Sequence, residues 1–102
     1  MNGGYVSSAY GFIGRYLGGS GTATVSSGSW VNSDDLSVGD LGTGTLNVAG
    51  GSVTNAVGYL GYNPEGVGTA TVSSGTWANN FLHVGENGTG TLNVTGGSVR
   101  CV

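Results

Sequence analysis

The chain contains the stretch Gly21-Thr-Ala-Thr-Val-Ser-Ser-Gly-Ser-Trp30, which returns 47 positions later as Gly68-Thr-Ala-Thr-Val-Ser-Ser-Gly-Thr-Trp77. Near-identity at a fixed period is typical of proteins built from stacked repeats. Shorter versions of the same opening begin at Gly42 and Gly88, so the four starting points are separated by 21, 26 and 20 residues. We interpret each interval as one coil of a solenoid.

Each coil contains three short segments with strand-like patterns. In the first, Thr22 to Val25, threonines alternate with apolar residues, as in a half-buried strand. The second joins a glycine to a Trp or Val and ends in asparagine, at 28–32, 51–55 and 75–79. The third is a short apolar run closed by glycine, as in 36–39. With no helical period, these segments predict an all-β fold, a parallel β-helix of about four to five coils of three short strands.

The repeats also predict how the chain is organised. We expect one β-helix segment over residues 1–102, with repeat units at approximately 3–49 and 50–97. Strands of successive coils lie about 4.7 to 4.9 Å apart, so four to five coils form a stub roughly 20 Å long. We therefore expect the segment to be a slice of a longer solenoid, and a gene fragment without an independent role is an alternative.

Stacking the coils in this register predicts columns of side chains in the interior. Alternation of large and small side chains would let a bulky ring fill the space beside a smaller neighbour. The first column, the expected structural core, is Val6, Trp30, Val53, Trp77 and Val99. The second is Val25, Leu46, Val72 and Leu92, and the third is Ile13, Val38, Leu60 and Val84. Gly11 and Gly58 are expected to alternate with Leu36 and Leu82.

The outward side chains are expected to form columns as well. Pairs of threonines form two of them: Thr22 and Thr24, Thr43 and Thr45, Thr69 and Thr71, Thr89 and Thr91. Another column is Phe12, Ser37, Tyr59 and His83. We also place Asn32, Asn55 and Asn79 outside, where stacked asparagines can hydrogen-bond to one another, with Cys101 at the same position of the last coil. Longer loops, 15–20 and 62–67, alternate with short turns and would project from one edge.

Composition excludes several functions. The 102 residues include 23 glycines, two basic residues and five acidic ones, which gives a net charge of -3 at pH 7. Because a basic footprint is absent, we expect no nucleic-acid partner. No segment approaches the ~20 apolar residues of a membrane helix, so we expect no direct membrane insertion. The first residues show neither a basic nor an apolar leader region, so we expect no signal peptide in this chain.

The alternation of Gly-Thr-Gly-Thr-Leu-Asn-Val-x-Gly-Gly-Ser-Val with Gly-Thr-Ala-Thr-Val-Ser-Ser-Gly-Ser-Trp resembles the repeats of autotransporter passenger domains and related bacterial surface β-helix proteins. The resemblance extends from Gly3 to Val99. It implies a right-handed parallel β-helix at the cell surface or outside the cell, serving as a stalk or an adhesive surface. The C-terminal β-barrel of a complete autotransporter is not present in this sequence. The family offers no catalytic residues to transfer.

An enzyme is the less favoured alternative, because polysaccharide lyases and hydrolases also use β-helices. Glycoside hydrolysis needs two carboxylates about 5 to 9.5 Å apart. Asp34 and Asp35 are adjacent, but no second acid stacks on them in the next coil. His83 lacks a cysteine or a second histidine that would complete a metal site. We therefore predict a protein that is not an enzyme and that has no catalytic residues, no metal and no cofactor.

The leading hypothesis is a structural or adhesive segment that presents a polar face and loops. Its candidate surface-binding residues are Phe12, Tyr16, Tyr59, Tyr62 and His83, which could stack on a host or matrix glycan or contact a protein surface. An ice-binding module using the threonine columns is an alternative, because regular threonines on a flat β-helix face resemble the surfaces of some antifreeze proteins. Unpaired strands at both ends lead us to expect end-to-end self-association of the isolated chain.

Overall fold

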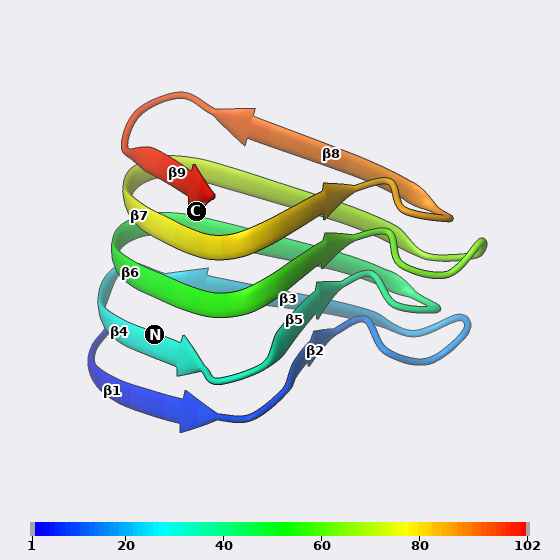
Figure 1. Ribbon diagram of the computed structural model, residues 1–102, viewed down its shortest axis with the longest axis horizontal. Coiled ribbons are helices and arrows are strands. Elements are labelled where there is room, and N and C mark those ends of the chain that lie inside the picture. The colour runs from blue at the N-terminus through cyan, green and yellow to red at the C-terminus, as the bar shows by residue number, and fades with distance from the viewer. Residues whose placement is uncertain (1, 102) are drawn as a thin grey trace.

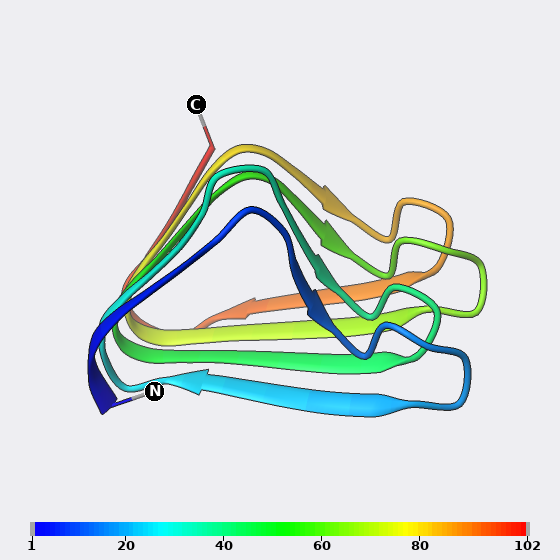
Figure 2. The same cartoon turned by 90° about the horizontal axis from the view of Figure 1, so that it is seen from below.

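The computed structural model describes residues 2–101, which form a right-handed parallel β-solenoid of about four turns (Figures 1 and 2). No helix occurs among these residues, so none of them forms a helix that could span a membrane. The strands are β1 (Asn2–Ser8), β2 (Gly11–Ile13), β3 (Ser20–Val25), β4 (Ser27–Asn32), β5 (Asp35–Val38), β6 (Thr43–Leu60), β7 (Val67–Val84), β8 (Thr89–Val94) and β9 (Ser98–Cys101).

Viewed along its axis, the solenoid is triangular (Figure 2). We name its sides face A, face B and face C. Face A consists of β3, residues 43–48 of β6, residues 67–72 of β7, and β8. Face B consists of β1, β4, residues 52–55 of β6, residues 76–79 of β7, and β9. Face C consists of β2, β5, residues 57–60 of β6 and residues 81–84 of β7.

Every strand pair is parallel, so each face is a sheet whose rungs come from successive coils. Each strand of face C ends at a glycine with a positive φ, between 71° and 76° at Gly14, Gly39, Gly61 and Gly85. Only glycine adopts this conformation without strain. At Gly39 a Cβ would lie 2.1 Å from the backbone oxygen of Val67, so the turn also requires glycine for space. These turns lead into four loops that project at the corner between faces C and A (Figure 2).

Two of the predicted interior columns are confirmed. The tryptophan column pairs Val6 with Trp30, Trp30 with Val53, Val53 with Trp77 and Trp77 with Val99. Val53 and Trp77 are completely buried, whereas Val6, at the end of the column, is 47% exposed. The column from Ile13 to Val84 is also confirmed, and so is the alternation of Gly11 and Gly58 with Leu36 and Leu82.

The predicted second column was wrong by two residues. Gly21 pairs with Gly44 instead of Gly42, so the coils measured on face A are 23, 24 and 22 residues long. Because side chains alternate with period two, a two-residue slip leaves each side chain on the correct side of the sheet and changes only its partner. The true columns are Ala23, Leu46, Ala70, Leu92 and Val25, Val48, Val72, Val94.

The same slip changes the outward threonines. Thr22, Thr45, Thr69 and Thr91 form one unbroken column. The neighbouring columns are mixed: one is Ser20, Thr43, Val67 and Thr89, and the other is Thr24, Asn47, Thr71 and Asn93.

The asparagine column was predicted correctly in register but wrongly on the outside. Asn32, Asn55 and Asn79 are only 2–3% exposed. Inside the solenoid, the Asn55 Nδ2 donates to the Asn79 Oδ1, and the Trp77 Nε1 donates to the Asn55 Oδ1 at 2.7 Å. These bonds satisfy polar groups that would otherwise be costly to bury. The asparagines therefore form an internal ladder, with Ser8 at one end and Cys101 at the other.

We expect Trp77→Ala to lower the free energy of unfolding by about 3 to 5 kcal/mol, because it leaves a cavity in the core and removes the donor to Asn55. Urea denaturation followed by circular dichroism measures this change. The control is Thr54→Ala, an exposed residue of the same face, which should change stability by less than about 0.5 kcal/mol. Equal effects of the two substitutions would contradict a core role for the tryptophan column.

Candidate binding surface

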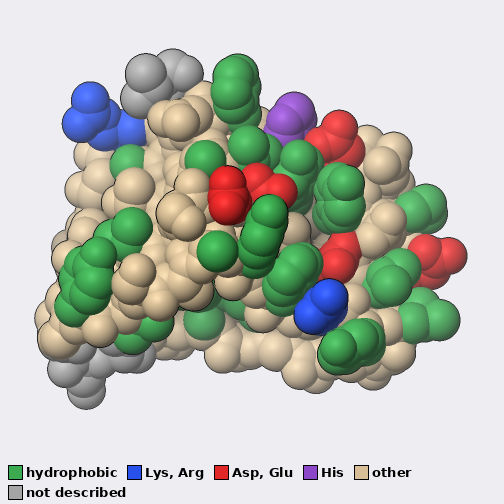
Figure 3. All heavy atoms as spheres, turned by 60° about the horizontal axis from the view of Figure 1, so that its bottom comes forward, with side chains coloured by type: hydrophobic (Ala, Val, Ile, Leu, Met, Phe, Trp, Pro, Cys, Tyr) green, Lys and Arg blue, Asp and Glu red, His purple; other side chains and the backbone are tan. Residues whose placement is uncertain are grey.

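Three of the five candidate surface-binding residues lie on the outward side of face C, and Tyr16 and Tyr62 lie in the loops that follow it. Phe12, Ser37, Tyr59 and His83 form one column, in successive coils and in the predicted register. Ser37 is only 3% exposed, whereas Phe12 is 41% exposed. We call this surface, with the loop residues that contact its rings, the aromatic column. Figure 3 shows one face of the molecule, on which hydrophobic, acidic, basic and histidine side chains lie next to one another.

Tyr59 lies at the centre of the upper part of the column. Its ring stacks on the His83 ring, with a centroid distance of 5.2 Å and an interplanar angle of 13°. The centre of the Tyr62 ring is 4.4 Å from that of Tyr59, and the two rings are tilted by 48°. The His83 Nδ1 lies 3.4 Å from the Glu86 Oε2. Three rings and one carboxylate therefore form a single cluster from β6, β7 and the loops that follow them.

A second cluster lies at the lower end of the column. The Arg15 guanidinium is 4.5 Å from the centre of the Phe12 ring and 5.4 Å from the centre of the Tyr16 ring. At these distances a cation is attracted to the face of an aromatic ring. Tyr16 and Leu17 remain 68% and 70% exposed. The loop after β2 thus extends the aromatic surface beyond the sheet.

Acidic residues surround the aromatic column. All five acids are in β5, directly before it, or in the loops after the strands of face C. The Asn63 Nδ2 donates to the Asp40 Oδ1 at 2.6 Å, which links two neighbouring loops. Burial of the phenol, followed by the charge of Asp35 and the neighbouring Tyr62 and Glu86, raises the pKa of Tyr59 above its usual 10.0. The surface is therefore aromatic at its centre and rich in carboxylates around it.

The side chains of this surface are of kinds that can contact a ligand. Exposed rings offer apolar faces, and carboxylates accept hydrogen bonds from hydroxyl groups. Among residues 2–101, no group of three or more His, Cys, Asp or Glu side chains is placed to hold a metal ion. Residues that could hold a cofactor are likewise not gathered at the aromatic column, whose members are rings and single carboxylates.

The structure places the five candidate residues in two clusters. Phe12 and Tyr16 both contact Arg15, whereas Tyr62 and His83 both contact Tyr59. The sequence reasoning missed Arg15 and Glu86. A signal was available, because both residues directly follow the glycine that closes a strand of face C, as Tyr62 does. Residues at this position lie beside the outward column of the preceding strand.

Comparisons of the chain with known protein families, with curated proteins and with solved structures give no match. The solenoid is compatible with a β-helix repeat protein, and this is the extent to which the resemblance to surface β-helix repeats is supported.

We expect Tyr59 to ionise at a higher pH than an ordinary phenol, because burial raises its pKa above 10.0. The raised pKa means that the folded protein favours the neutral phenol, so its contribution to stability is complete below pH 10 and is lost as the pH rises through the folded-state pKa. Titration of phenolate absorbance should show one late component that Tyr59→Phe removes. Tyr10→Phe, outside the aromatic column, should leave that component in place. A late component that persists in Tyr59→Phe would refute the environment described for Tyr59.

Proposed function

We propose that the chain is a non-catalytic structural and adhesive segment of a bacterial β-helix protein at the cell surface or outside the cell, and that the aromatic column binds carbohydrate. The observation that carries the proposal is the cluster of Tyr59, Tyr62 and His83 on a rigid parallel sheet. A solenoid positions such rings at the spacing of its coils, about 4.8 Å, without a loop having to fold on binding.

The chemistry of the surface favours a neutral glycan over a charged one. Ring faces pack against the C–H groups of a sugar, and the carboxylates of Asp35 and Glu86 can accept hydrogen bonds from its hydroxyls. Acidic glycans would be repelled, because Asp35 and Glu86 lie beside the rings and the net charge is -3. A protein surface with exposed C–H and hydroxyl groups is the other type of partner that this chemistry accommodates.

Tyr59→Ala tests the proposal on an array of neutral and acidic glycans. We expect neutral-glycan binding to weaken about tenfold, because a stacked ring is lost. Tyr59→Phe keeps the ring and should retain most of the binding, and Thr45→Ala on face A is the matched control. Unchanged binding by Tyr59→Ala, with the fold intact by circular dichroism, would rule out this surface.

Face A supports a second candidate function, the binding of ice. The column of Thr22, Thr45, Thr69 and Thr91 is unbroken, and the coils that carry it differ by at most two residues in length. Its hydroxyls repeat about every 4.8 Å across the coils, and the flanking columns lie about 6.6 Å away along the strands. A regular array of this kind can order water on a flat surface.

A thermal-hysteresis assay tests the second candidate. If face A binds ice, Thr69→Tyr should abolish hysteresis, because a bulky ring would break the flat surface. Thr54→Tyr on face B should leave hysteresis unchanged. A wild-type chain without measurable hysteresis removes this candidate and leaves the carbohydrate proposal untouched.

A further inference from the structure

The two ends of the solenoid carry matching strand edges on face A. Within the described chain, β3 pairs only with β6, and β8 pairs only with β7. The sequence of β8, TGTLNV, is identical to residues 43–48, and that of β3, SGTATV, differs from residues 67–72 only at its first residue. Inside the molecule, residues 43–48 pair with residues 67–72. The β8 of one copy can therefore form with the β3 of another copy a pairing that the fold already contains.

The side chains at the two ends are complementary in size. In the column of Ala23, Leu46, Ala70 and Leu92, the small residue lies at the N-terminal end and the large one at the C-terminal end. On face C, the column of Gly11, Leu36, Gly58 and Leu82 runs in the same order. The small residue is required there, because a Cβ on Gly11 would lie 2.9 Å from the Leu36 Cδ1.

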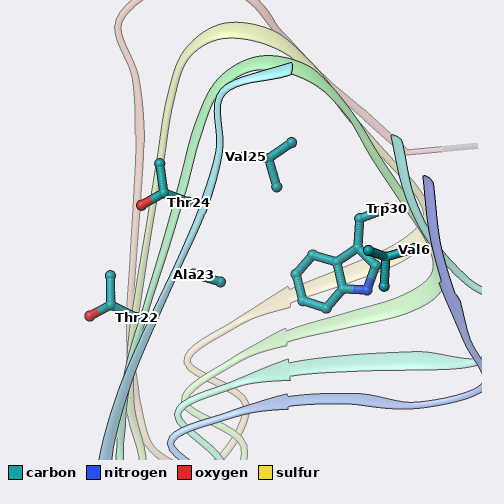
Figure 4. Close-up of a pocket in the computed structure, with 6 residues that line it drawn as sticks. All are labelled: Val6, Thr22, Ala23, Thr24, Val25 and Trp30. Atoms are coloured by element: carbon teal, nitrogen blue, oxygen red, sulfur yellow. The ribbon is translucent and has the colours of Figure 1, made fainter. Parts of the chain in front are cut away.

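A hollow at the N-terminal end shows where a large side chain would enter. Its volume is about 310 Å³, and its lining is Val6, Thr22, Ala23, Thr24, Val25 and Trp30. Figure 4 shows the Ala23, Val25 and Trp30 side chains pointing into the solenoid, with the threonines turned away. At the opposite end Leu92 is partly buried, and Val94 and Val84 are 51% and 46% exposed.

We propose that the 102-residue chain binds a second copy of itself head to tail, with β8 against the partner's β3 and residues 81–84 of β7 against the partner's β2. Leu92 would then lie over Ala23 of the next copy, as Leu46 lies beside Ala70 inside the molecule. The interface joins two different ends, so it does not close on itself and can continue into a filament.

Face B sets a condition on this assembly. It has five strands in the described chain, whereas faces A and C have four each. When faces A and C of two copies join without a gap, β9 of one copy and β1 of the next fall on the same rung. Both strands offer a valine to the tryptophan column, Val99 against Trp77 and Val6 against Trp30. Only one of these two strands can occupy the rung, so the other must detach from face B.

The asparagine ladder favours β1 over β9. The Nδ2 atoms of Asn32 and Asn79 are both buried without a hydrogen-bond partner among the described residues, and Asn79 is the one next to the end of the ladder, opposite Cys101 of β9. Ser8 of β1 occupies the same rung position, and its hydroxyl donates to the Asn32 Oδ1 at 2.6 Å. A hydroxyl can also accept, so Ser8 of the next copy gives the Asn79 Nδ2 an acceptor. Strand β9 therefore acts as a removable cap that slows assembly.

Variants with one blocked end test the head-to-tail geometry. Val94→Lys blocks the C-terminal end and Val6→Lys blocks the N-terminal end, and each should weaken self-association at least tenfold in analytical ultracentrifugation with a reductant present. An equimolar mixture of the two should form dimers and nothing larger, because one unblocked end remains on each. Thr54→Lys, an exposed residue in the middle of face B, adds the same charge and should associate like the wild type.

The cap is tested by variants of β9. Cys101→Asn should weaken association severalfold relative to Cys101→Ala, because an asparagine would give the Asn79 Nδ2 a partner within the same chain. Removal of residues 98–102 should strengthen association about tenfold. A wild-type chain and a residue 98–102 deletion that both stay monomeric at millimolar concentration would overturn the proposal. So would dimers of either single-end variant alone, since they require like ends to meet.

Discussion

Size complementarity between neighbouring coils is the constraint on which this structure depends. In a narrow interior, two large side chains cannot lie directly over each other in successive coils, and tight packing leaves no gap between two small ones. The chain meets this constraint by alternating Val with Trp, Ala with Leu, and Gly with Leu along three of its columns, while the columns that begin at Val25 and Ile13 contain aliphatic residues of similar size. Two successive coils are therefore unlike each other, and the unit that repeats is a pair of coils.

The same constraint explains why polar groups lie inside. Trp77 is completely buried, and its ring nitrogen reaches the asparagine ladder at the corner of faces B and C. A buried indole needs an acceptor, and the Asn55 amide supplies one while its nitrogen bonds to the next asparagine. Core packing and the internal ladder are thus two parts of one arrangement, and this leaves the outer faces available for binding.

The sequence supported the fold class, the three strands per coil, the tryptophan column and the outward column of Phe12, Tyr59 and His83. Predictions from the sequence were wrong where the local pattern allowed two registers, or where a residue type is usually found on the surface. Gly42-Thr-Gly44-Thr offers two starting points two residues apart, and either one keeps the same residues inside. Asparagine is usually exposed, so its placement outside was the ordinary expectation. Only the hydrogen bond from the Trp77 ring nitrogen to Asn55 shows why Asn55 is buried.

The sequence by itself determined that this protein is a parallel solenoid, because period-two alternation and repeated glycines leave few other ways to bury its apolar residues. It also determined that the surface has few charges, and that most of them are acidic. Only the tertiary structure decided which rings touch and which ends match. Those features depend on contacts between residues in neighbouring coils, about 23 positions apart in the chain. The register between coils decides which of these residues are in contact, and no local sequence pattern specifies that register.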